Sequence, residues 1–267
     1  MSDPKPMTIL AIDTAGSSLA ASLNHQGMIY QRTTVSRKHA NHLTPLVSGL
    51  CDSARIALDD IDLIAVNVGP GPFTGLRVGL AYVRGLAHAL SCPVAPITHS
   101  ELLAHHAMRY AHDHNIPCQY IATLIDARLG QAYFSISSTH NGCLEIHTPD
   151  CVLDYHQIPD LTDLDSCVTA GDDWQSLADQ LPTERKSLLH IPGHSLADAS
   201  DFDAQSLVDC NNLAAITRAT SMLVMVGMLL NQDRLNSVGA ESLSPLYVRH
   251  DVAKKTVDRN PSSTDST

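Results

Sequence analysis

Two aspartates, each at the end of an apolar run, are the side chains with the clearest potential for chemistry. Asp13 ends the run TILAI and is followed by Thr14 and further hydroxyls, and Asp126 ends a later run beside Arg128. A carboxylate among hydroxyls and backbone amides could hold Mg²⁺ and nucleotide phosphates, although neither segment contains a lysine. An aspartate at a strand end can equally bond the backbone two residues on, and Arg128 could pair with a carboxylate. A weak nucleotide contact and a local turn both remain open for Asp13, Thr14 and Asp126.

The segment Gly69–Arg77 reads GPGPFTGLR and joins an apolar run to an amphipathic pattern. Glycine-rich turns in that position often cradle a phosphate through successive backbone N–H groups. Pro70 and Pro72 have no N–H group to offer, and no Lys-Ser/Thr pair follows. We therefore expect this turn to fix backbone geometry and to let a helix pack closely, with the Thr74 hydroxyl available as a cap for that helix.

His39 and His42 lie three residues apart on a predicted helix and could ligate one metal ion, as a metallohydrolase would require. No downstream carboxylate stands out as a third ligand, so a solvated or capping role is favoured and no metal site is predicted. The sequence also lacks a Gly-x-Ser-x-Gly elbow and any cysteine motif that would lower the pKa of a thiol. We predict no catalytic residue.

Charge and composition argue against nucleic-acid binding by the chain alone, a disulfide framework and a membrane span. The 267 residues include 28 acidic and 17 basic side chains, for a net charge of −11, so the chain is a poor candidate for binding nucleic acid by itself. Seven scattered cysteines without a C-x-x-C pair indicate reduced thiols. The longest apolar run, Met222–Leu230, is too short to span a bilayer, and the N-terminus is polar. We expect a cytoplasmic protein without membrane contact.

Hydrophobic periodicity predicts an α/β chain in which a strand that ends in aspartate and is followed by a hairpin occurs twice. The predicted strands cover residues 8–12, 19–24, 27–34, 63–68, 94–97, 120–125 and 131–137. Predicted helices cover residues 40–56, 75–90, 100–113 and 212–231. The order resembles the start of an actin-like ATPase lobe, repeated after residue 120 with Asp126 in the place of Asp13. Residues 143–205 look less regular. The expected fold is a two-lobed actin-like ATPase (ASKHA) fold, a duplicated mixed sheet flanked by helices.

Four segments carry a family resemblance: ILAIDTAGS at 9–17, GPGPFTGLR at 69–77, IDARLGQAY at 125–133 and PLYVRHDVAKK at 245–255. In order and spacing they resemble the TsaB (YeaZ) family, a subunit of the bacterial machinery that makes threonylcarbamoyladenosine in tRNA. Pro72 departs from the family, which more often has Ser there. The resemblance implies a first lobe at 1–116, onto which a helix at 211–231 packs back, and a smaller second lobe at 117–255. Residues 256–267 contain no apolar anchors, so we expect a disordered tail there.

The predicted helix at 75–90 carries a stripe of small residues. Ala81, Gly85 and Ala89 recur every four residues, a spacing that lets another helix approach closely. The stripe could instead pack inside its own lobe. In the resembled family, the helices at 40–56 and 76–90 form a bundle with the matching pair of TsaD. The partner-binding residues predicted on this basis are His42, Leu43, Leu46, Leu50, Arg77, Leu80, Ala81, Arg84, Gly85 and His88. A bulky residue at Gly79 or Gly85 is expected to abolish binding without harming the fold.

The resemblance implies a non-catalytic subunit that binds a TsaD-like transferase and supports threonylcarbamoyl transfer to adenosine 37 of tRNA. A TsaE-like ATPase would join the assembly, and tRNA would be reached only through the complex. The same helices could form a homodimer when the partner is absent. No tightly bound cofactor is expected, and ATP or ADP with Mg²⁺ could bind weakly at the cleft or at the complex interface. The alternative is a Mg-ATP-dependent actin-like phosphotransferase or ATPase that uses Asp13 and Asp126.

Overall fold

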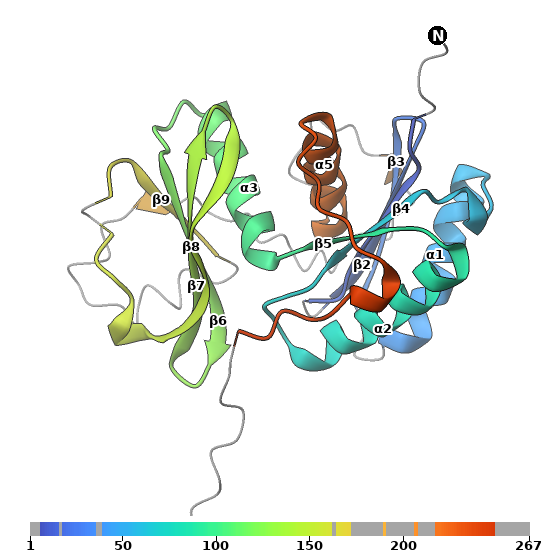
Figure 1. Cartoon of the computed structure of the whole chain (residues 1–267), viewed down its shortest axis with the longest axis horizontal. Coiled ribbons are helices and arrows are strands. Elements are labelled where there is room, and N and C mark those ends of the chain that lie inside the picture. The colour runs from blue at the N-terminus through green and yellow to red at the C-terminus, as the bar shows by residue number, and fades with distance from the viewer. Residues whose placement is uncertain are drawn as a thin grey trace, which may run out of the picture.

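The computed structural model describes residues 6–15, 18–35, 39–161, 164–171, 189–190, 206–207 and 217–248. These residues form two mixed sheets flanked by helices, side by side in Figure 1. The first sheet has six strands in the order β11-β3-β2-β1-β4-β5, and the second has five in the order β10-β9-β6-β7-β8. The predicted tail at 256–267 and the predicted helical residues 211–216 lie outside the described residues.

Two neighbouring strands near the centre of the first sheet are completely buried. Its strands are β1 (Ile9–Asp13), β2 (Ser18–His25), β3 (Met28–Val35), β4 (Leu63–Asn67), β5 (Val94–Ile97) and β11 (Ser206–Leu207). β1 pairs antiparallel with β2 and parallel with β4. Every residue of β1 and β4 is buried, which is why both strands read as unbroken apolar runs and not as alternating ones. The five predicted strands of this sheet lie within a residue or two of the observed bounds.

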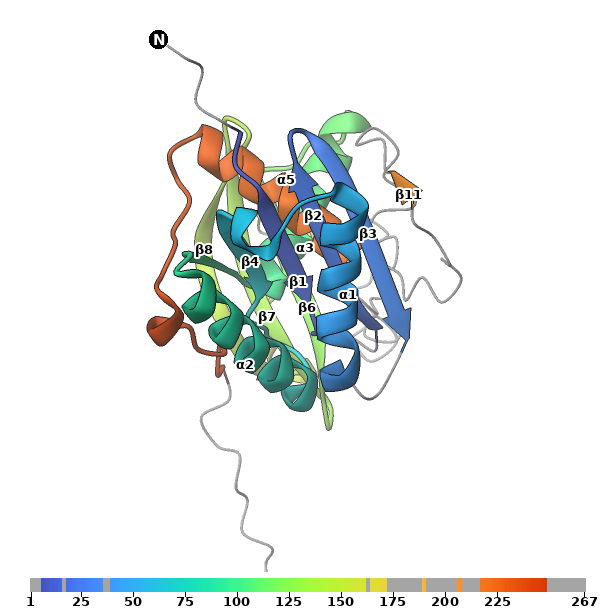
Figure 2. The same ribbon diagram turned by 90° about the vertical axis from the view of Figure 1, so that its right-hand side faces the viewer.

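Helices cover both faces of the first sheet. α1 (His39–Ala54) and α2 (Phe73–Leu90) lie together on one face, and α3 (His99–Asp113) and α5 (Arg218–Asn231) lie on the other side (Figure 2). The apolar stripes of α1 and α2 share one core cluster with the sheet, whereas α5 buries Met222, Leu223 and Val226 against the opposite face. α5 therefore packs on the first sheet, although it follows the second sheet in the sequence. The lobe boundary at residue 116 stays a prediction.

The second sheet repeats the hairpin arrangement. It contains β6 (Tyr120–Arg128), β7 (Gln131–His140), β8 (Cys143–Asp154), β9 (Cys167–Ala170) and β10 (Leu189–His190). The expectation of an irregular stretch from residue 143 was wrong for β8, which is a twelve-residue edge strand. Its Pro149 and Asp150 mask the strand pattern, and a proline is tolerated there because the β7–β8 register shifts near Phe134 and Ile136.

The GPGP turn fixes geometry as expected. Gly69 has φ of 101°, a conformation that favours glycine, and its peptide bond to Pro70 is cis. The Gly69 carbonyl accepts a hydrogen bond from the His99 backbone N–H at 2.7 Å, so the turn presents a carbonyl to α3. A Cβ atom at Gly71 would lie 3.1 Å from the Ala15 carbonyl oxygen. The cap prediction was wrong: α2 begins at Phe73 after Pro72, with no side-chain hydrogen bond at the cap.

The segment 243–248 connects the two cores. Leu243 and Leu246 pack into the cluster beneath α1 and α2, and the Leu246 N–H donates to the Val68 carbonyl at 2.9 Å. Two residues later, Val248 packs against the cluster between α3 and the second sheet. Figure 1 shows this segment crossing from the η5 turn (Ala240–Ser242) toward β6. The PLYV motif therefore links the first sheet to the second.

The contact between α3 and α5 generates a pH prediction. The His105 ring Nε2 lies 3.2 Å from Met228 Sδ, and burial, with Arg109 and His106 nearby, lowers the pKa of His105 to about 4. A lowered histidine pKa means that its contribution to stability is complete above about pH 6.5 and is lost as the pH falls toward 4. We expect protonation of His105 to lower the free energy of unfolding by about 3 kcal/mol across that pH range.

Urea unfolding of His105→Gln and the wild type between pH 7 and pH 4 measures that cost. The variant should flatten the pH profile, because glutamine does not titrate. His112→Gln is the control, since the His112 side chain on the same helix is 88% exposed. Equal slopes for wild type and His105→Gln would show that His105 does not govern acid stability.

Candidate functional site

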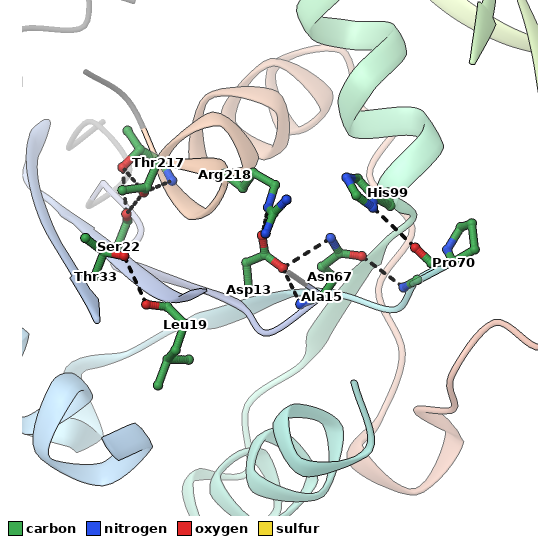
Figure 3. Close-up of polar contacts among 12 residues, drawn as sticks. Asp13, Ala15, Leu19, Ser22, Thr33, Asn67, Pro70, His99, Thr217 and Arg218 are labelled. Atoms are coloured by element: carbon green, nitrogen blue, oxygen red, sulfur yellow. Dashed lines mark hydrogen bonds and ion pairs between the residues drawn. The ribbon is translucent and has the colours of Figure 1, made fainter. Parts of the chain in front are cut away.

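Asp13 is held in a buried polar network at the end of β1 (Figure 3). Its Oδ1 accepts hydrogen bonds from the Ala15 backbone N–H at 2.8 Å and from Asn67 Nδ2 at 3.3 Å. Its Oδ2 accepts from Arg218 Nε at 2.5 Å, and the two side chains are only 1% and 9% exposed. The local-turn interpretation of Asp13 therefore holds, together with an ion pair that links β1 to the first residue of α5.

The pairing with Arg218 changes what Asp13 can do. A carboxylate that holds Mg²⁺ needs an oxygen facing an open site, whereas both Asp13 oxygens already accept hydrogen bonds inside the core. Thr14 is also 1% exposed, and a Cβ atom on Gly79 would lie 2.2 Å from its Oγ1. Thr14 thus packs against α2. Nucleotide binding by this pair stays a prediction that the described residues do not favour.

Asp126 repeats the turn of Asp13 at the second sheet. Its Oδ1 accepts from the Arg128 backbone N–H at 2.7 Å, and its Oδ2 lies 3.3 Å from Arg128 Nη1. Arg128, Leu129 and Gly130 all have positive φ, so the motif forms a tight hairpin tip on which Leu129 is 90% exposed. Each aspartate thus accepts a hydrogen bond from the backbone N–H of the residue two positions later. This shared turn supports the duplication expected from the sequence. The structure does not bring the two carboxylates into one network of hydrogen bonds.

The contacts described for His42 and Ser100 do not support the chemistry considered for histidine and serine side chains. His42 is exposed on α1, the His39 side chain lies outside the description, and no described group of three or more His, Cys, Asp or Glu residues could hold a metal ion. Ser100 donates a hydrogen bond to Asp150, and burial raises the pKa of that carboxyl. A nucleophilic serine instead needs a histidine base within hydrogen-bond reach. The described contacts give Ser100 no such base.

The predicted partner-binding residues of α1 and α2 fall into an exposed group and a buried group. Those that line the exposed side are His42, Arg77, Ala81, Arg84, Gly85 and His88. The four leucines were wrongly placed in this group, since they are at most 8% exposed. They belong to the core because the apolar side of each helix faces its own sheet. The buried leucines are Leu43, Leu46, Leu50 and Leu80.

Gly79 and Gly85 of α2 likewise differ in whether they are buried or exposed. A Cβ atom at Gly85 would meet nothing within 4 Å, so this position is open. Gly79 is buried against Thr14, and a bulky residue there would disturb the fold as well as any interface. The expectation that both positions tolerate large side chains was therefore wrong for Gly79. Sequence periodicity alone did not separate them.

An exposed aromatic group at the start of α2 was not predicted. The rings of Phe73 and Tyr247 are stacked with their centroids 6.3 Å apart, and the Arg77 guanidinium lies 5.9 Å from the Phe73 centroid. Phe73 is 36% exposed and Tyr247 is 48% exposed. The motifs GPGPFTGLR and PLYV hold these residues, but only the fold shows that the two motifs meet.

Comparison with known proteins agrees with the motifs. The family model described as TsaD, tRNA N6-adenosine threonylcarbamoyltransferase, matches residues 26–167, more than half of the chain. A Bacillus subtilis protein named tRNA threonylcarbamoyladenosine biosynthesis protein TsaB is 32% identical over 146 residues, which cover 54% of this chain and 61% of the relative. The chain belongs to the TsaB (YeaZ) family. The TsaB of Escherichia coli is 26% identical over 255 residues, 93% of this chain and 97% of that protein.

Solved structures of the TsaB (YeaZ) family show the same fold. YeaZ from Pseudomonas aeruginosa superposes with a TM-score of 0.68 at 28% identity, covering 91% of this chain and all of that one. The match to the first relatives is partial, since it spans 61% and 53% of the B. subtilis and Haemophilus influenzae TsaB proteins. Together with the two mixed sheets, these likenesses confirm the actin-like ASKHA fold. No described helix is long and apolar enough to cross a membrane.

The buried pair of Asp13 and Arg218 predicts a strong effect on stability. Asp13→Asn keeps an acceptor for Ala15 but removes the negative charge beside a buried guanidinium, so we expect it to cost about 3–5 kcal/mol of unfolding free energy. Asp126→Asn is the matched control, because the ion pair with the 85% exposed Arg128 is worth about 1 kcal/mol or less. Denaturant titration compares the two variants. Equal losses would contradict the central role of the buried pair.

Proposed function

We propose that this chain is a non-catalytic subunit in tRNA threonylcarbamoyladenosine biosynthesis, which binds a TsaD-like transferase through the outer face of α1 and α2. The names of the TsaB relatives support the pathway. The observation that carries the mode of action is the outer face of α2, where Ala81 and Gly85 are exposed in the middle of a helix. Small exposed residues at four-residue spacing suit the close approach of a second helix.

Charge supports a partner of acidic character. α2 has eighteen residues without a single Asp or Glu, and its exposed side carries Arg77, Arg84 and His88. The chain as a whole has a net charge of −11, so this helix is a local exception. Acidic groups flanking the partner's helices would pair with these basic side chains at the rim, where they would favour correct association.

We propose a non-catalytic role because the side chains that could act in catalysis are already paired with other residues of the protein. Asp13 is neutralised by Arg218, and the Ser100 hydroxyl donates to Asp150. The phosphotransferase or ATPase alternative requires Asp13 to face Mg²⁺, and the observed pairing weighs against that role. The proposal therefore includes no tightly bound cofactor, and ATP or ADP with Mg²⁺ would bind only weakly, at the cleft or the interface with the transferase. A TsaE-like ATPase would join the complex, tRNA would be contacted only through it, and the protein would work in the cytoplasm.

A reconstituted transfer assay tests the function. Threonylcarbamoyl incorporation into tRNA is measured with the same organism's TsaD-like and TsaE-like proteins, with and without this chain. We expect activity that requires the chain, and none from the chain alone with ATP, the threonylcarbamoyl adenylate and tRNA. Turnover by the chain alone, or Mg-ATP stabilisation of the isolated chain in a thermal shift, would support the enzymatic alternative instead.

The binding face is tested by one substitution with a matched control. Gly85→Leu should weaken binding to the TsaD-like subunit at least a hundredfold, because the new side chain occupies the groove that a partner helix would fill. The fold should remain intact, since a Cβ atom there meets nothing within 4 Å and leucine favours the helix. Gly227→Leu changes a similarly open glycine on α5 and should leave affinity unchanged.

Isothermal titration calorimetry with the purified partner gives both affinities. Thermal unfolding of each variant checks that the fold is retained. If Gly85→Leu bound with wild-type affinity, or if both variants lost binding equally, the α1–α2 face would not be the binding site. In the absence of a partner, the same face would form a homodimer, and Gly85→Leu should then shift the chain to monomer in analytical ultracentrifugation.

A further inference from the structure

A cavity of about 480 Å³ lies on a part of the molecule that the proposed function does not use. It is bounded by α3 on one side, by α5 on another and by the tip of the β7–β8 hairpin. Figure 1 shows α3 and α5 facing each other between the two sheets. Two lining residues are also hydrogen-bonded to each other, since Arg234 Nη2, just after α5, donates to the Leu144 carbonyl on β8 at 3.1 Å.

The wall of this cavity has an unusual concentration of soft ligand atoms. His105 and Met108 lie three residues apart on α3, and Met225 and Met228 lie three residues apart on α5. Residues at that spacing share one face of a helix, so each helix presents a pair of side chains to the same space. Across the two helices, His105 Nε2 and Met228 Sδ make a hydrogen-bond contact at 3.2 Å.

We propose that His105, Met108, Met225 and Met228 form a binding site for a single Cu(I) ion. If the bonds are as long as those of zinc, about 2.0 Å to nitrogen and 2.3 Å to sulfur, two ligands of one ion lie about 3.0–3.5 Å apart when the angle between them is about 90–110°. The 3.2 Å separation of Nε2 and Sδ lies in that range. Thioether and imidazole ligands select the soft cuprous ion over hard divalent ions.

The surroundings of the four residues fit a soft monovalent ion. His105 is 7% exposed and lines the cavity, so its imidazole is held away from bulk solvent. Glu101 and Glu145 also line the cavity, whereas the described residues contain no cluster of three His, Cys, Asp or Glu that would suit Zn²⁺. Met108 and Met228 are partly exposed, which gives an ion a path from solvent.

Methionine-methyl NMR tests the site directly. The full chain is labelled with ¹³C at the methionine methyl groups and titrated under argon with Cu(I) supplied as its bicinchoninate complex. At one equivalent we expect the signals of Met108, Met225 and Met228 to move, while those of the exposed Met7 and Met28 stay in place. Zn²⁺ at the same concentration should move none of them.

Competition with bicinchoninate gives the affinity. Met228→Leu should weaken Cu(I) binding at least tenfold with little change in stability, because the two side chains have similar volumes. Met28→Leu, the same change on the surface, should have no effect. Cys143→Ser separates thiol binding from the proposed site, since the Cys143 thiol also lines the cavity. Retained affinity in Met228→Leu, or loss of the methyl shifts in Cys143→Ser, would overturn the assignment.

Discussion

The buried ion pair between Asp13 and Arg218 is the interaction on which the arrangement of the chain depends. It joins the end of β1, the central strand, to the first residue of α5, which comes more than two hundred residues later. Desolvating both charges is costly unless they meet with good geometry, so the pair admits few alternative positions for the helix. Thr217 caps α5 beside it and Thr220 bonds Ser22 on β2 at 2.6 Å, which fixes the same helix end a second time.

Once α5 occupies one face of the first sheet, the remaining elements have defined places. α1 and α2 must cover the other face, and their apolar stripes merge with β1, β2 and β4 into one core. The GPGP turn leads the chain into α2, and its Gly69 carbonyl also accepts a hydrogen bond from the His99 N–H at the start of α3. α3 packs on α5 and on the second sheet, and the segment that ends at Val248 ties the second core to the first. The exposed side of α2 is what remains after these contacts are satisfied.

The sequence predicted most of the first sheet and its helices, because those elements have clear apolar periods. It failed where the signal was not local. β8 was missed since an edge strand with Pro149 shows no alternation, and Arg218 was missed because its partner is distant in the chain. The four leucines of α1 and α2 illustrate a further limit. Periodicity identifies an apolar face, but it cannot say whether that face meets the protein's own sheet or a partner.

The pairing of Asp13 with Arg218 bears on the proposal that this chain is non-catalytic. A carboxylate at the end of the first strand can hold a metal ion only when one of its oxygens faces an open site. Here a guanidinium from α5 supplies the positive charge that a metal ion would supply, from inside the protein and permanently. The ion pair thereby joins α5 to the first sheet, while α1 and α2 share one core with the other face of that sheet. Helices that are packed into a shared core suit binding to a second protein, because ordering them costs little conformational freedom on association.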